Sequence, residues 1–177
     1  MTIKEPLPSK APEMRRLLEP LVRHGVDFVL IGGAAGNAWG SSHLTYALDI
    51  VYARDRANIA RLVAALEEIG VRLRGAPADL PFQLDARTIE NGANFTFETP
   101  HGDFDALADV AGIRSYDELR ANSDPREVWG LTIRIASLDD LIAMKRAANR
   151  PKDRNMVDEY IVIAEERRLE AEGGVGD

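Results

Sequence analysis

The stretch that most constrains the fold of this chain is residues 28–54, FVLIGGAAGNAWGSSHLTYALDIVYAR. An apolar run at 28–31 predicts a buried strand, and Gly32 and Gly33 follow it directly. Glycines between a strand and a short helix leave backbone N–H groups open to an anion at the electropositive helix N-terminus. The pattern predicts either an anion-binding turn or a plain tight turn.

A second strand is predicted at 45–53. Its alternation places Leu48 and Ile50 on one face and Ala47 and Asp49 on the other. Aspartate is depleted in strand interiors, so Asp49 needs an explanation. It is either a ligand or a capped or edge residue.

A hairpin is predicted from strands at 94–98 and 103–108, with Asp103 and Asp105 on one face of the second strand. Two acids there are consistent with a solvated face or with cation binding. The preceding segment, 72–94, is polar and rich in proline and glycine, which favours a loop over a site, with a short helical pattern near 85–90.

Helical periodicity and turn residues account for most of the remaining chain. Helices are predicted at 11–24, 57–69, 116–121, 137–148 and 153–168, with a small hairpin at 127–135. Lys145 and Asp153 are polar residues on the apolar faces of the last two helices. They could pair as a structural salt bridge, Lys145 could extend to solvent, or Lys145 could meet an anion.

Composition indicates one globular domain. The 177 residues carry a net charge of −7 and no cysteine, which excludes disulfides and thiolate zinc sites. No run reaches the roughly 20 apolar residues of a membrane span, and the first residues have no apolar signal-peptide core, so we expect a cytoplasmic protein. We expect one domain over 1–170, with a C-terminal helical part at 137–168 and a flexible tail at 171–177.

The motif Gly32-Gly33, followed by Ala47-Leu48-Asp49-Ile50, resembles that of the nucleotidyltransferase superfamily, which has the fold of DNA polymerase β. That motif is Gly-Gly or Gly-Ser, a gap, then Asp-h-Asp-h on a strand, where h is apolar. The resemblance implies an α/β (α+β) fold with a mixed β-sheet flanked by helices and a C-terminal helical segment. The segments GVDFVLIGGAA, LTYALDIVYARD, GDFDALADVAGI and SLDDLIAMKRAANRPKD are similar to those of the AbiEii and MenT-type toxins of toxin–antitoxin systems.

The resemblance implies a set of roles. Mg²⁺ would bind Asp49 and Asp105, with Asp103 as a second choice for the later carboxylate. A nucleoside triphosphate would donate its nucleotide to an acceptor hydroxyl on tRNA, and a small cognate antitoxin protein would be a partner. The remaining roles are phosphate binding by Gly32 and Gly33, contact with the triphosphate by Lys145, orientation of Lys145 by Asp153, and lining of the site by Thr45.

Two positions depart from the family pattern. His43 stands where an arginine is usual, and Ala47 stands where the first metal-binding aspartate is expected. A methyl group binds no metal, so we expect this chain to be inactive. Because Asp49, Asp105 and Lys145 all persist, as does Asp153, we favour a deliberate replacement of aspartate at 47 over natural decay.

Other functions stay open from the sequence. The chain could be a naturally inactive protein that keeps the pocket to bind a nucleotide or a partner. It could also be a nucleotidyltransferase that modifies a protein or a small molecule such as an antibiotic. We expect an antibiotic-modifying enzyme to need a second domain for its substrate, and this chain has little room for one.

Overall fold

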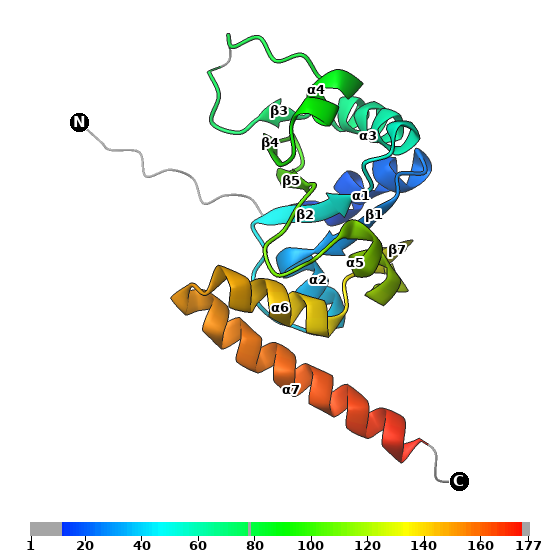
Figure 1. Ribbon diagram of the computed structural model, residues 1–177, viewed down its shortest axis with the longest axis vertical. Helices are drawn as coiled ribbons and strands as arrows, with labels where there is room; N and C mark the ends of the chain where they lie inside the picture. Colours follow the sequence, from blue (N-terminus) through cyan, green and yellow to red (C-terminus); the bar gives the residue numbers. More distant parts are fainter. Residues whose placement is uncertain (1–11, 78, 175–177) are drawn as a thin grey trace, which may run out of the picture.

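The computed structural model describes residues 12–77 and 79–174, whose arrangement Figure 1 shows. Across these residues a seven-stranded mixed sheet runs in the order β3-β4-β5-β2-β1-β7-β6. The strands are β1 (Phe28–Ile31), β2 (Ala47–Tyr52), β3 (Arg72–Leu73), β4 (Phe95–Glu98), β5 (Asp103–Leu107), β6 (Asp124–Val128) and β7 (Leu131–Ile135). The helices are α1 (Met14–Arg23), α2 (Gly32–Trp39), α3 (Arg56–Ile69), α4 (Ala86–Asn91), α5 (Tyr116–Asn122), α6 (Leu138–Ala148) and α7 (Pro151–Gly173). The predicted fold class is confirmed.

The centre of the sheet is β1 with its neighbours. All four residues of β1 are buried, as expected of an apolar strand covered on both faces. It pairs antiparallel with β2 and parallel with β7. On the other side, β2 pairs parallel with β5, and β4 extends the sheet antiparallel to β5.

The alternation of β2 separates the core from the site. Leu48 and Ile50 are fully buried, while Ala47 and Asp49 are only partly so and belong to the opposite face. In the parallel pair, Asp49 is opposite Asp105 and Ala47 is opposite Asp103. The prediction that Asp49 and Asp105 lie side by side in one mixed sheet is confirmed.

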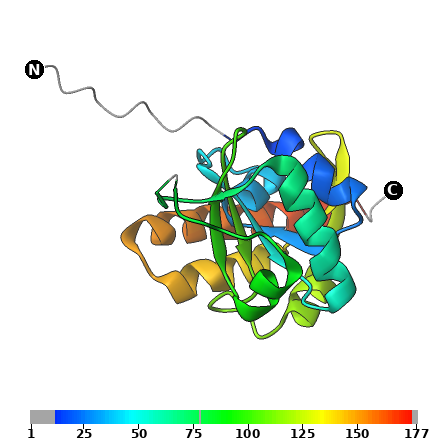
Figure 2. The ribbon, with the colours of Figure 1, turned by 90° about the horizontal axis from the view of Figure 1, so that it is seen from above.

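Helices cover the sheet in two groups. Helix α1 contacts α3, while α2 contacts both β2 and α6. In Figure 1, α6 and α7 lie at the lower end of the view and α3 at the upper end, and Figure 2 shows the sheet between them from above. Helix α6 packs along α7, so the C-terminal helices are held to the sheet on the α2 side.

Several boundaries differ from the prediction. Helix α1 begins at Met14, and the predicted start at residue 11 lies outside the described residues. Helix α7 continues to Gly173, past the predicted end at 168 and into the predicted tail, whose last residues, 175–177, also lie outside the described part.

The short helical pattern predicted near 85–90 is confirmed as α4. The rest of the segment 72–94 differs from a plain loop, because it contains β3, which pairs antiparallel with β4 at the sheet edge. A two-residue strand is too short to leave a periodic signal in the sequence. Within the described residues, no helix combines the length and apolar character needed to cross a membrane.

Candidate active site

A pair of carboxyl groups on β2 and β5 forms the centre of the candidate site. Asp49 and Asp105 are opposite one another in the parallel register. Burial, followed by the charge of Asp105 and a hydrogen bond with it, raises the pKa of Asp49 to about 7, and the charges of Lys145 and Arg74 only partly offset this. Two carboxylates held together at partial burial are costly, so the pair is suited to bind a cation.

The N-terminus of α2 lies directly against this pair. A Cβ atom added to Gly32 would collide with the Asp49 carboxylate, and one added to Gly33 would lie 2.6 Å from Thr45 Oγ1. Gly32 also has a φ of +68°, a conformation that other residues rarely adopt. The two glycines therefore let the backbone amides of α2, the Asp49 carboxylate and the Thr45 hydroxyl meet at one point.

Asn37 holds the loop that carries Thr45. With its amide oriented to satisfy its neighbours, Asn37 accepts a hydrogen bond from the Thr45 hydroxyl (3.0 Å) and donates to the carbonyl oxygens of Ser41 (3.0 Å) and His43 (2.8 Å). His43 Nε2 in turn lies 2.7 Å from Glu159 Oε2 on α7. The loop before β2 is thus fixed to both α2 and α7, and the sequence gives no periodic signal for the role of Asn37.

Lys145 reaches the site from α6. Its Nζ lies 3.2 Å from Asp153 Oδ1, and its side chain is 18% exposed. Arg150 Nε lies 2.7 Å from Asp153 Oδ2, and the Arg150 N–H donates to the same oxygen (3.2 Å). The predicted pairing of Lys145 with Asp153 is confirmed, and Arg150 is a third member that the sequence reasoning missed.

Asp153 anchors this group of charges. Burial alone would raise its pKa, but hydrogen bonds from Arg150 and Lys145 outweigh burial and lower the pKa of Asp153 to about 2. The carboxylate is fully buried yet stays ionised. It therefore fixes the direction of the Lys145 side chain and ties the start of α7 to α6.

Arg74 is the second residue that the sequence reasoning missed. It directly follows β3, and its Nη2 donates to Asp105 Oδ1 (2.6 Å) while its Nε lies 3.2 Å from Asp103 Oδ2. Asp103 is opposite Ala47, so Arg74 contacts the part of the sheet face where the family pattern places its first aspartate.

The residues present fit one divalent cation better than two. Magnesium often uses one or two carboxylates and completes its shell with phosphate oxygens and water, which Asp49 and Asp105 allow. Across residues 12–77 and 79–174, no group of three or more histidine, aspartate or glutamate side chains is arranged to hold a metal ion. Position 47 offers only a methyl group beside the pair.

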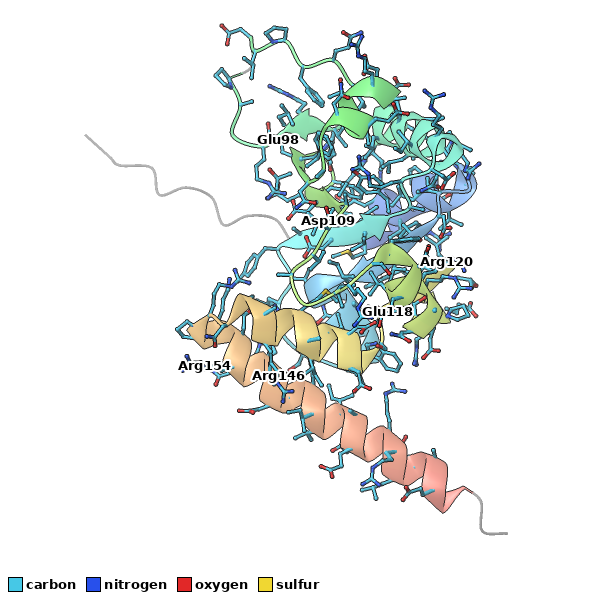
Figure 3. All side chains as sticks on the ribbon, viewed as in Figure 1. Glu98, Asp109, Glu118, Arg120, Arg146 and Arg154 are labelled. Carbon is cyan, nitrogen blue, oxygen red and sulfur yellow. The ribbon has the colours of Figure 1, made fainter. Side chains whose placement is uncertain are left out.

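Cavities near and away from the pair differ in character. One cavity of about 240 Å³ lies at the α6–α7 corner, and Lys145, Arg146 and Arg154 are among its lining residues. Figure 3 labels Arg146 and Arg154. Another, of about 570 Å³, is lined by Trp39 and by residues of α6 and the C-terminal half of α7. The first adjoins the candidate site and is basic, whereas the second lies apart from the carboxylates.

Comparison with known proteins gives structural matches at low identity. No protein-family model matches this chain. No curated protein matches it either. The lincosamide antibiotic adenylyltransferase LnuA, solved with lincomycin bound, has 12% sequence identity and a TM-score of 0.60, and the match covers 85% of this chain and 96% of LnuA. ANT(2'')-Ia in complex with adenylyl-2''-tobramycin has 13% identity and a TM-score of 0.56, with 89% of each chain covered.

A proposed nucleotidyltransferase from Thermotoga maritima matches with 13% identity and a TM-score of 0.52, covering 84% of this chain and 89% of that one. At these identities the similarity establishes the fold alone. This chain has the nucleotidyltransferase fold.

The match to LnuA bears on one expectation from the sequence. The aligned region makes up 96% of LnuA and 85% of this chain, so LnuA is no longer than this chain. LnuA is thus an antibiotic adenylyltransferase whose matched chain is no longer than this one.

We expect Asp49→Asn to stabilise the fold above pH 7 by about 1–3 kcal/mol. The pKa of Asp49 is raised in the folded chain, so the folded state holds this proton more tightly than the unfolded state. Stability of the unmodified chain should fall as the pH rises from about 4 to about 7 and then level off. The asparagine variant lacks this loss.

Urea unfolding at pH 5 and pH 8 in EDTA measures the difference between the two chains. Asp109→Asn, at an exposed position after β5 (Figure 3), is the control and should change little. A gain from Asp49→Asn that is equal at both pH values would contradict the raised pKa.

Proposed function

We propose that this chain is a nucleotidyltransferase of the toxin type, which transfers a nucleotide from a nucleoside triphosphate to an acceptor hydroxyl on tRNA. With alanine at position 47, the chain is inactive. We further propose that residues 1–170 form one domain, that the protein works in the cytoplasm, and that a small antitoxin protein binds it.

One observation carries the proposal. The Asp49–Asp105 pair lies against the N-terminus of α2, and Lys145 approaches the same point from α6. Phosphoryl and nucleotidyl transfer require carboxylates that bind a cation, backbone amides that bind phosphate, and a lysine oriented toward the phosphate groups.

Each residue has a distinct task in this proposal. The amides at Gly32 and Gly33 and the Thr45 hydroxyl bind phosphate oxygens. Lys145 binds the triphosphate and is held in direction by Asp153, which is a positioning residue. The reacting phosphate is thereby fixed in orientation before an acceptor hydroxyl attacks it.

Asp49 and Asp105 would hold Mg²⁺ when nucleotide is present. Bound there, the ion would neutralise phosphate charge and help to orient the attacking oxygen. Ala47 leaves one carboxylate out of this arrangement. Loss of such a ligand costs several kcal/mol at the transition state, which is on the order of a thousandfold in rate.

The α6–α7 corner supports a nucleic-acid acceptor. Although the chain carries a net charge of −7, Lys145, Arg146 and Arg154 line one cavity in this corner together with a single acid, Asp158. Arg150 and Lys152 lie in the turn and first residues of α7 that follow α6. A basic surface within an acidic protein is a local feature suited to an RNA backbone.

Two other functions have specific observations in their favour. Modification of a small molecule is favoured by the match to LnuA, a lincosamide antibiotic adenylyltransferase. A naturally inactive protein that binds a nucleotide or a partner is favoured by Ala47 itself. Modification of a partner protein would use the same site.

Ala47→Asp should convert the inert chain into a Mg²⁺-dependent nucleotidyltransferase. Position 47 lies two residues from Asp49 on the same strand face, so a carboxylate there completes the pair of the family motif. The measurement is incubation of both chains with labelled nucleoside triphosphates, Mg²⁺ and total tRNA, followed by detection of label on RNA.

The outcomes separate the candidate functions. Label with the aspartate variant alone is the expected result. Equal labelling by both chains would mean that the metal site is misassigned. Label on lincomycin or an aminoglycoside but not on RNA would favour the small-molecule function, and no transfer by a folded variant would favour an inactive binding protein.

Lys145→Ala, made in the Ala47→Asp background, should lower transfer about a hundredfold or more. It should cost less stability than Asp153→Ala, because Arg150 still pairs with the buried Asp153 carboxylate. Asp153→Ala should lower transfer less but destabilise the fold by about 2–4 kcal/mol, because it removes a buried carboxylate shared by two cations. Transfer rates and urea unfolding measure the two effects separately.

Exposed residues in the C-terminal part of α7 provide matched controls. Arg168→Ala and Glu166→Ala remove a positive and a negative charge there without touching Lys145 or Asp153. A Lys145→Ala variant that keeps full transfer would show that Lys145 has only a structural role.

A further inference from the structure

The Arg74 side chain lies on the same carboxylate oxygens that a cation would use. Its backbone N–H donates to Thr96 O (3.0 Å), which fixes the residue to the sheet edge. Its Nη2 donates both to Phe97 O (2.9 Å) and to Asp105 Oδ1 (2.6 Å). The guanidinium is thus held by β4 and directed at the Asp105 carboxylate.

The contact with Asp103 is weaker in geometry. Arg74 Nε lies 3.2 Å from Asp103 Oδ2, but this buried nitrogen has no partner in hydrogen-bond geometry. Arg74 is 32% exposed and Asp105 is 21% exposed, so water can replace the contact when the guanidinium moves. A partly exposed ion pair of this kind is of modest strength.

A guanidinium and a divalent cation compete for Asp105 on simple electrostatic grounds. Each is attracted by the negative charge of Asp105. Each binds the carboxylate more strongly when the other does not share Oδ1. Arg74 Nη2 already donates to Asp105 Oδ1 (2.6 Å), so a metal ion that uses this oxygen together with Asp49 requires that Arg74 give it up.

We propose that Arg74 is an internal cation that occupies Asp105 in the resting site and must release it for a divalent metal ion to bind. This inference rests on the proposed function, because it takes Asp105 as a metal ligand. Arg74 is in this account a positioning residue that sets the metal affinity of the pair.

The test measures Mn²⁺ binding to the chain as it stands, by the loss of the free-ion signal in electron paramagnetic resonance. Mn²⁺ is the probe because, like Mg²⁺, it favours carboxylate and water ligands. Arg74→Ala should tighten binding about tenfold, since the competing ion pair is gone. Arg74→Lys, which keeps the charge but not the forked contact, should give a smaller gain and also guards against loss of folding.

A double-mutant cycle separates competition at Asp105 from a general change in charge. In the Asp105→Asn background, Arg74→Ala should give no gain. Arg72→Ala, which removes an exposed charge from the same strand, should change binding less than about twofold. Melting curves establish that each variant is folded.

Three results would overturn the inference. They are unchanged or weaker Mn²⁺ binding by Arg74→Ala, an equal gain in the Asp105→Asn background, and an equal gain from Arg72→Ala. If Asp105→Asn alone leaves Mn²⁺ binding unchanged, the proposed metal site itself is wrong, which is a separate failure.

Discussion

The parallel pairing of β2 with β5 is the constraint on which the rest of the site depends. Its register places Asp49 beside Asp105 and Ala47 beside Asp103 on one face. A shift of one residue would turn either acid to the other face of the sheet. The buried side chains Leu48 and Phe104, at matching positions of the two strands, hold that register from the core side.

Charge on this face is balanced by residues from three distant parts of the chain. Arg74 directly follows the edge strand β3, Lys145 belongs to α6, and the amides belong to the first residues of α2. Burial, and after it the charge of Asp105, raises the pKa of Asp49, so two carboxylates beside each other are unfavourable without these partners. The fold thus brings together charged groups that are best balanced when a phosphate and a cation are bound.

Elements with a clear period could be predicted from the sequence, and elements fixed by tertiary contact could not. Strand alternation indicated the faces of Asp49 and Asp105, and only the resemblance to the nucleotidyltransferases joined them in one site. Helical spacing indicated that Lys145 and Asp153 could pair. Arg74 follows a two-residue strand inside a segment rich in proline and glycine, where no period identifies its partner. The roles of Asn37 and Arg150 likewise arise from contacts that only the folded chain creates.

The most direct test of the account is to locate the ion and the nucleotide. Crystals of the Ala47→Asp variant grown with Mn²⁺ and a non-hydrolysable nucleoside triphosphate would be examined by anomalous diffraction. The account predicts an anomalous peak about 2.1–2.3 Å from carboxylate oxygens of both Asp49 and Asp105, with the triphosphate between the α2 N-terminus and Lys145. A peak bound elsewhere, with the nucleotide away from α2, would contradict it.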